Sequence, residues 1–121
     1  MTIHYLSILN PKECPTYIYI KQGIKTVEGR KNSKKYQKYK KGDTIIFTYD
    51  NEELKTEITY INKYKTVEDY LRNETLECTL PNIKSIKDGI EIYNLWTKVK
   101  ERKELCKKYG YGFLGIGIKL I

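Results

Sequence analysis

The chain has 121 residues, of which 40% are hydrophobic and 31% are charged, and 12 of them are tyrosines. This length and composition predict one folded domain over residues 1–121, and they exclude a multidomain enzyme, a disordered tail and a membrane-spanning protein. Lysine and arginine outnumber aspartate and glutamate by 23 to 15, a formal net charge of +8. Such a charge is typical of proteins that bind phosphate groups. Because a lysine-rich chain without alanine also arises from an AT-rich coding sequence, the local clustering of charge is more informative than its total.

Several segments have the composition of β-strands. Residues 3–9, 25–30 and 44–49 are rich in β-branched and aromatic side chains, and the turn pair Gly42-Asp43 precedes the third of them. Residues 56–64 alternate apolar with polar side chains and follow the turn-forming pair Asp50-Asn51. We therefore expect the strands at 44–49 and 56–64 to pair as a hairpin.

Residues 15–23 fit two different structures. The run Tyr-Ile-Tyr-Ile at 17–20 suits a buried strand, whereas Pro15 in a first turn and Gly23 as a stop suit a helix of two turns. The pattern alone leaves both interpretations open.

Two capping patterns predict helices in the second half of the chain. Residues 66–69 and 85–88 each place a hydroxyl three positions before an aspartate. In this pattern the hydroxyl accepts a hydrogen bond from a backbone amide of the first helical turn, and the acidic side chain suits the positive end of the helix dipole. The predicted helices cover residues 67–73 and 86–98, and the second has apolar side chains at the three-to-four spacing of a buried face.

The end of the chain predicts a helix followed by a strand. One or two further helical turns over residues 101–108 end at Gly110. Residues 113–121 alternate glycine with leucine and isoleucine, which indicates a central strand that neighbouring groups approach closely. Together these elements predict an α+β fold with a small curved or barrel-like sheet and helices at one side.

The strand at 25–30 carries three charged residues, Lys25, Glu28 and Arg30. Side chains alternate between the faces of a strand, so Glu28 and Arg30 should lie on the same face and pair. Such a pair is either a salt bridge that holds the turn or part of a binding site, and spacing alone favours the salt bridge.

The segment 31–41 contains six lysines and no acidic residue, and Tyr36 and Tyr39 lie between them. Ammonium groups can contact phosphates, and flat tyrosine rings can stack on exposed bases. A solvated lysine-rich loop explains the same pattern equally well.

Residues suited to catalysis or metal binding are sparse. His4 is the only histidine and lies in an apolar strand, so we expect a hydrogen-bonded core histidine. The three cysteines form neither a disulfide framework nor a zinc pattern, and of these only Cys106 has basic neighbours. The glycines at 110–117 are not followed by a helix and do not match a phosphate-binding loop. We therefore expect no metal and no cofactor.

The sequence contains no signal-peptide pattern and no run of about 18 apolar residues. We expect an intracellular, cytoplasmic protein in a reducing compartment. The codon bias fits a large DNA virus, a low-GC bacterium or an AT-rich protist, and a viral protein would act in the cytoplasm or nucleus of its host.

Three segments together resemble an ASCH domain, a member of the PUA-like superfamily. They are the G-x-K-x-x-E-x-R element within residues 20–30, the strand that starts at Gly42-Asp43, and the ending at 109–118. Between the second and the third of these segments, the resemblance also includes the capped helix that starts at Thr66. The likeness covers nearly the whole chain. It implies a small β-barrel of about five strands flanked by helices, with residues 15–22 helical, and a cleft that binds RNA or a nucleotide-like ligand.

The resemblance also implies which residues form that cleft. It places Lys25, Glu28 and Arg30 in the cleft and the basic segment at its rim. We expect a monomeric domain that engages single-stranded or modified RNA and that does not bind a membrane. The expected RNA-binding residues are Lys25, Glu28, Arg30, Lys31, Lys35, Tyr36, Lys38, Tyr39 and Lys41.

An enzymatic alternative comes from the same resemblance. Some relatives are similar to small amidohydrolases that remove the acetyl group from acetylated cytidine with a lysine, a threonine and a glutamate. Lys25 matches the lysine, but Glu28 stands at the position of the threonine, and for the third residue only Glu74 and Glu77 lie nearby. The alternative function is therefore an amidohydrolase or ribonuclease that acts on a modified nucleoside or RNA, with Lys25 and Glu28 as catalytic residues, and whether the protein is an enzyme stays open.

Overall fold

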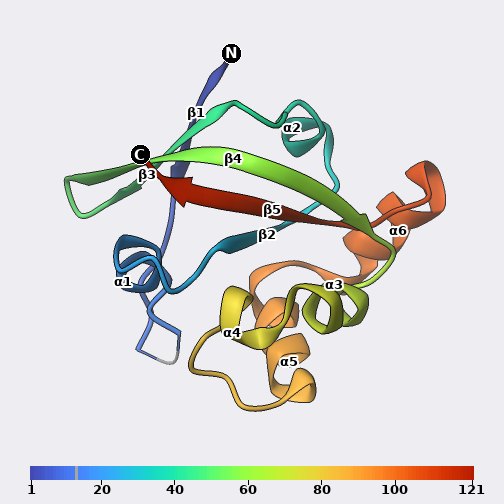
Figure 1. The fold of residues 1–121 in the computed structure, drawn as a ribbon. Coiled ribbons are helices and arrows are strands. Elements are labelled where there is room, and N and C mark those ends of the chain that lie inside the picture. The colour runs from blue at the N-terminus through green and yellow to red at the C-terminus, as the bar shows by residue number, and fades with distance from the viewer. Residues whose placement is uncertain (13) are drawn as a thin grey trace.

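A computed structural model describes residues 1–12 and 14–121. The fold is α+β, with a five-stranded sheet in the order β1-β3-β4-β5-β2 that curls into a half-barrel (Figure 1). β1 pairs with β3 in parallel, and the other neighbours are antiparallel. The strands are β1 (Ile3–Ser7), β2 (Val27–Lys31), β3 (Thr44–Tyr49), β4 (Glu52–Tyr64) and β5 (Phe113–Leu120). The predicted fold class is confirmed.

The hairpin of β3 and β4 forms as predicted but is longer. Asp50 and Asn51 adopt φ of 46° and 67°, in the left-handed region that these two residue types tolerate better than most. β4 begins at Glu52 rather than at residue 56, because β3 pairs along its full length, from Thr44 opposite Glu57 to Tyr49 opposite Glu52. The polar residues at the start of β4 gave no alternating pattern that could predict this extension.

β5 is a central strand, as its glycines predicted, and it lies between β4 and β2. Gly29 of β2 faces Gly115 of β5 in the register. A Cβ atom on Gly29 would lie 2.7 Å from the hydroxyl oxygens of both Tyr70 and Tyr93. The absence of a side chain at Gly29 therefore lets two large tyrosines pack directly on the strand.

Six helices occur in the part of the chain that the structure describes. Both predicted caps form, since Thr66 accepts a hydrogen bond from the Asp69 amide and Ser85 accepts one from the Asp88 amide, each at 3.1 Å. Residues 16–21 are helical, as the family resemblance implied. Two four-residue helices were not predicted. The helices are α1 (Thr16–Lys21), α2 (Lys34–Gln37), α3 (Val67–Glu74), α4 (Leu76–Thr79), α5 (Ile86–Trp96) and α6 (Val99–Tyr109).

The buried side chains form two hydrophobic clusters. One joins α1 and the segment around α2 to the sheet, and includes Tyr17, Tyr39 and Phe47. The other joins α3, α4 and α5 to the sheet, and includes Tyr70 and Phe113. Helices therefore contact both clusters, and the expectation of helices at one side only is wrong (Figure 1).

Within residues 1–12 and 14–121, no helix combines the length and the apolar character needed to cross a lipid bilayer.

Candidate functional site

The three charged residues of the β2 segment meet in space. The alternation of the strand predicted the pairing of Glu28 with Arg30, but it did not predict the contact of Glu28 with Lys25. Glu28 is at the centre: its Oε1 lies 3.7 Å from Lys25 Nζ, and its Oε2 lies 3.3 Å from Arg30 Nη2. Arg30 Nη1 donates a hydrogen bond of 3.1 Å to the hydroxyl of Tyr36. We call Lys25, Glu28, Arg30 and Tyr36 the β2 ion chain.

The inner end of the β2 ion chain is shielded from solvent. Lys25 is only 2% exposed and Glu28 only 5%. Lys25 Nζ also donates to the carbonyl oxygens of Val27 and Thr79, so its three donors all face acceptors of the protein. Burial lowers the pKa of Lys25, and the carboxylate of Glu28 partly opposes this shift.

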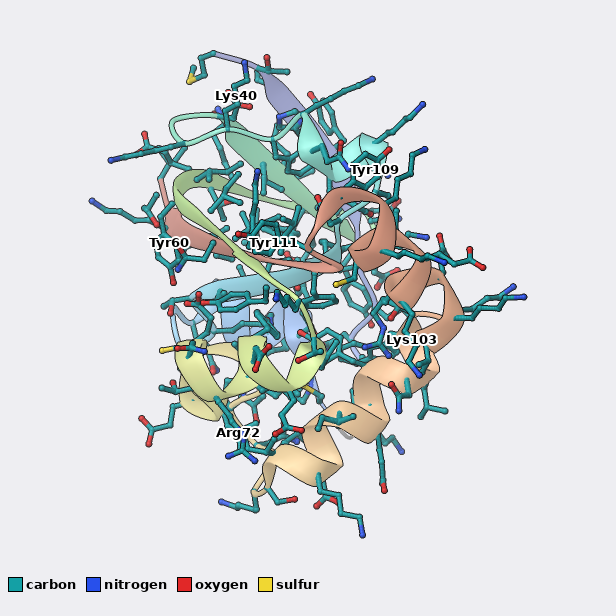
Figure 2. All side chains as sticks on the ribbon, turned by 90° about the vertical axis from the view of Figure 1, so that its right-hand side faces the viewer. Lys40, Tyr60, Arg72, Lys103, Tyr109 and Tyr111 are labelled. Atoms are coloured by element: carbon teal, nitrogen blue, oxygen red, sulfur yellow. The ribbon has the colours of Figure 1, made fainter. Side chains whose placement is uncertain are left out.

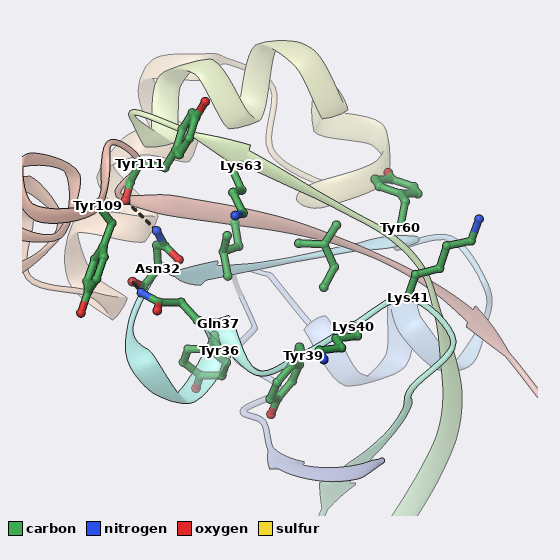
Figure 3. A pocket seen from close by; sticks show the side chains of 12 residues that line it. Asn32, Tyr36, Gln37, Tyr39, Lys40, Lys41, Tyr60, Lys63, Tyr109 and Tyr111 are labelled. Atoms are coloured by element: carbon green, nitrogen blue, oxygen red, sulfur yellow. Dashed lines mark hydrogen bonds between the residues drawn. The ribbon is translucent and has the colours of Figure 1, made fainter. Parts of the chain in front are cut away.

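A separate groove of about 750 Å³ opens on the face seen from the α6 side, where Tyr60, Tyr109 and Tyr111 lie (Figures 2 and 3). Its walls come from the α2 region, from β4, and from the connection between α6 and β5. We call it the tyrosine–lysine groove, because five tyrosines and three lysines line it and none of the described lining residues is acidic. The lining residues are Asn32, Tyr36, Gln37, Tyr39, Lys40, Lys41, Tyr60, Ile61, Lys63, Tyr109, Tyr111 and Leu114.

Side-chain amides join the two walls of the groove. Asn32 Nδ2 donates a hydrogen bond of 2.9 Å to the backbone oxygen of Tyr111, and Gln37 Nε2 donates one of 2.9 Å to the backbone oxygen of Asn32 (Figure 3). Asn32 itself is buried, and its Oδ1 has no hydrogen-bond partner. One lining residue of the groove therefore keeps a buried acceptor that the described protein groups do not satisfy.

His4 and Asp43 support the segment that follows α2. The His4 ring stacks on Tyr39 with 3.8 Å between the ring centroids, and His4 Nε2 lies 2.8 Å from Asp43 Oδ2. Asp43 also accepts from the backbone amides of Lys40 and Thr2. The expectation of a hydrogen-bonded histidine is confirmed. Its acidic partner could not be predicted, because it lies 39 positions away in the sequence.

The predicted RNA-binding residues separate into two groups. Tyr36, Tyr39 and Lys41 line the tyrosine–lysine groove, whereas the others do not. Lys25, Glu28 and Arg30 belong to the β2 ion chain. Lys31 pairs with Glu101 at 2.6 Å, and Lys35 Nζ lies 5.3 Å from the centre of the Tyr36 ring. Lys38 is exposed. Sequence reasoning missed Tyr60, Lys63, Tyr109 and Tyr111, because only the pairing of β4 with β5 brings them close to the basic segment 31–41.

The described residues hold no group of three histidine, cysteine, aspartate or glutamate side chains that could bind a metal ion. Cys14, Cys78 and Cys106 are free thiols.

The comparison with known families finds a match that spans the element at Gly23 to Arg30 and the strands β2 to β4. The model of the ASCH domain matches residues 15–116. The chain belongs to the ASCH domain family. The resemblance inferred from the sequence is thereby confirmed.

Two solved structures resemble this ASCH domain over nearly its whole length. The crystal structure of hypothetical protein PH0355 has 30% sequence identity and a TM-score of 0.83, and the match covers 99% of this chain and 100% of that one. The solution NMR structure of protein PF0455 from Pyrococcus furiosus has 28% identity and a TM-score of 0.76, with 99% and 98% covered. None of the curated proteins compared with the chain matches it. Neither structure's name states an activity.

Proposed function

We propose that this ASCH domain binds single-stranded RNA in the tyrosine–lysine groove. The observation that carries the proposal is the lining of that groove, which combines five tyrosines with three lysines and has no acidic residue among those described. Its volume of about 750 Å³ lies within the range of about 300–1,000 Å³ that is usual for ligand sites.

The lysines supply the contacts to phosphate. Lys40, Lys41 and Lys63 are exposed, and no ion pair of the described residues includes them. Their charges are therefore available to phosphates, and binding would release the counterions condensed on the RNA.

The tyrosines supply surfaces for bases. Tyr111 is 41% exposed and Tyr109 is half-buried, so both can offer a ring face to an unstacked base, at about 1–3 kcal/mol for each stacked base. In this proposal Arg30 acts through Tyr36, whose hydroxyl it holds, rather than by contact with RNA.

Salt dependence tests the proposal. We compare the wild type with a variant in which Lys40, Lys41 and Lys63 are replaced by alanine, measuring RNA affinity by fluorescence anisotropy over a range of salt concentrations. Each lysine that contacts a phosphate contributes about 0.7 to the slope of log affinity against log salt, so the triple variant should lose about 2 units of slope.

A matched variant controls for net charge. Lys55, Lys84 and Lys87 are also exposed, but they lie outside the groove. Their replacement by alanine removes the same charge and should leave most of the slope intact. Equal losses in the two triple variants would contradict binding in the groove.

A second candidate function is hydrolysis of a modified nucleoside or of RNA, and a separate observation favours it. Lys25, whose pKa is lowered by burial, lies 3.7 Å from a carboxylate and borders a smaller groove of about 240 Å³. Incubation of the protein with acetylated cytidine and with labelled RNA tests it, with Lys25→Met as control. Product that forms only with Lys25 present supports an enzyme, and absence of product from both substrates contradicts one.

A further inference from the structure

Arg102, in α6, differs from the other two arginines of the chain. Arg30 pairs with Glu28 and Arg72 pairs with Glu68, at 3.3 and 3.0 Å. Arg102 is in none of the ion pairs found among the described residues. Its guanidinium is only partly satisfied, because Nη2 donates to Asn94 Oδ1 while the buried Nε has no hydrogen-bond partner. A buried N–H donor without an acceptor calls for an explanation, such as a water molecule or an ion.

Arg102 lines a cavity of about 530 Å³ between the start of α3, the end of α5, α6 and the start of β5. We call it the α6 cavity. Three lysines line it together with Arg102, and its one carboxylate, that of Glu68, is already paired with Arg72. The charged lining residues are Lys65, Glu68, Arg102, Lys103 and Lys107.

We propose that the α6 cavity binds a phosphate oxyanion. A guanidinium presents parallel N–H donors that match the oxygen atoms of a phosphate, and Arg102 lines the cavity without a carboxylate partner among the described residues. The three lysines add positive charge around the same space, and the partial burial of the cavity weakens screening by salt. Neutral and apolar groups such as Ile90, Val99 and Phe113 complete the lining.

The phosphate can come from two sources. It can be a free phosphate or part of a small phosphorylated molecule, which requires nothing of the tyrosine–lysine groove. It can also be the backbone of the strand bound in that groove, and this version rests on the proposed function. The two sites meet at the connection between α6 and β5, since Tyr109 and Tyr111 line the groove while Gly112 and Phe113 line the cavity. In Figure 2, Tyr109 and Tyr111 lie between Lys40 above and Lys103 below.

A titration of the full chain with inorganic phosphate tests the site itself. We expect saturable NMR shifts of the Gly112 and Phe113 amides, with the affinity weakened roughly tenfold or more in Arg102→Gln and less in Arg102→Lys, which keeps the charge. Lys87→Ala, which removes a charge outside the cavity, should bind phosphate like the wild type. The amide spectrum of each variant shows directly that it is folded.

An oligonucleotide series separates the two sources. Oligouridines of about four and about ten nucleotides are compared, because the longer one extends further from the groove toward the cavity. If the strand supplies the phosphate, Arg102→Gln weakens the longer oligonucleotide and leaves the shorter one unchanged. If free phosphate shifts the amides but the oligonucleotides do not depend on Arg102, the ligand is a small phosphate. No Arg102-dependent response to either probe overturns the proposal, whereas failure of the shorter oligonucleotide to bind contradicts only the proposed function.

Discussion

Tyr111 is the residue at which the proposed base stacking in the groove can be tested most directly. Tyr111 is 41% exposed, and the hydrogen bond that it makes with the described residues is the one that its backbone oxygen accepts from Asn32. We therefore predict that Tyr111→Ala weakens RNA binding by about 1–3 kcal/mol without changing the free energy of unfolding by more than about 0.5 kcal/mol. Anisotropy and urea unfolding measure the two quantities. Tyr5→Ala is the control, because this exposed tyrosine lies in β1 outside the groove, and an equal loss of affinity there would contradict a specific stack.

Asp43 makes a pH-dependent contribution to stability. Burial alone would raise the pKa of its carboxyl, but hydrogen bonds from His4 and from the amides of Thr2 and Lys40 lower it below its ordinary value. The unfolded chain therefore binds a proton more readily than the folded protein, so the stabilisation is complete above about pH 4 and is lost as the pH falls through the lowered pKa.

The prediction is a difference in urea midpoint between the wild type and Asp43→Asn that is constant between about pH 6 and pH 4 and shrinks below it. The measurement is a series of urea unfolding curves for both proteins. A difference that grows toward acidic pH would contradict the sign of the shift.

At the scale of single residues, the sequence predicted contacts within one strand and missed those between distant segments. The pairing of Glu28 with Arg30 follows from alternation along β2 and is confirmed. The burial of Lys25 could not be predicted, because one of its acceptors is the carbonyl of Thr79, 54 positions away.

Among the elements, α3 is tied to β4 through one carboxylate. Glu74 at the end of α3 accepts hydrogen bonds from Tyr60 Oη at 2.6 Å, from Asn62 Nδ2 at 2.9 Å and from Tyr64 Oη. The buried carboxylate thus satisfies three donors on one strand. Burial of the Tyr64 hydroxyl, together with its hydrogen bond to Glu74 and the charge of that carboxylate, raises the pKa of Tyr64 to about 12. Since Tyr60 also lines the tyrosine–lysine groove, this contact helps to position one of its walls.

We predict that Glu74→Ala lowers the free energy of unfolding by about 1–3 kcal/mol, because it leaves these donors without their acceptor. Glu77→Ala, which removes an exposed carboxylate only three positions away, should change it by less than about 0.5 kcal/mol. Urea unfolding compares the two. Equal stabilities of the two variants would show that Glu74 does not hold α3 on the sheet.

The elements that could be predicted are those with a local signal. The capping patterns at Thr66 and Ser85 gave the starts of α3 and α5, and Gly110, with φ of 87°, gave the end of α6. The helices α2 and α4 could not be predicted, because each has four residues, too few for an apolar period to develop.

For the whole molecule, the fold class followed from the sequence but the groove did not. The curved α+β sheet could be predicted from strand and helix patterns and from the family resemblance. The tyrosine–lysine groove draws on three stretches, at 32–41, 60–63 and 109–114, that only the order of β4 and β5 brings together. The basic segment, which the sequence analysis singled out, forms one wall of the groove. The residues at 60–63 and 109–114 that line the rest of it carry no recognisable motif.

The most direct measurement of the central claim is an NMR titration of the isotopically labelled protein with a short oligouridine. We predict that shifted amides concentrate in residues 32–41, 60–63 and 109–114, the three stretches that line the groove, while the amides of α5 stay unchanged. Shifts that are absent at saturating RNA, or that cluster on α5 or around β1 instead, would contradict RNA binding in the tyrosine–lysine groove.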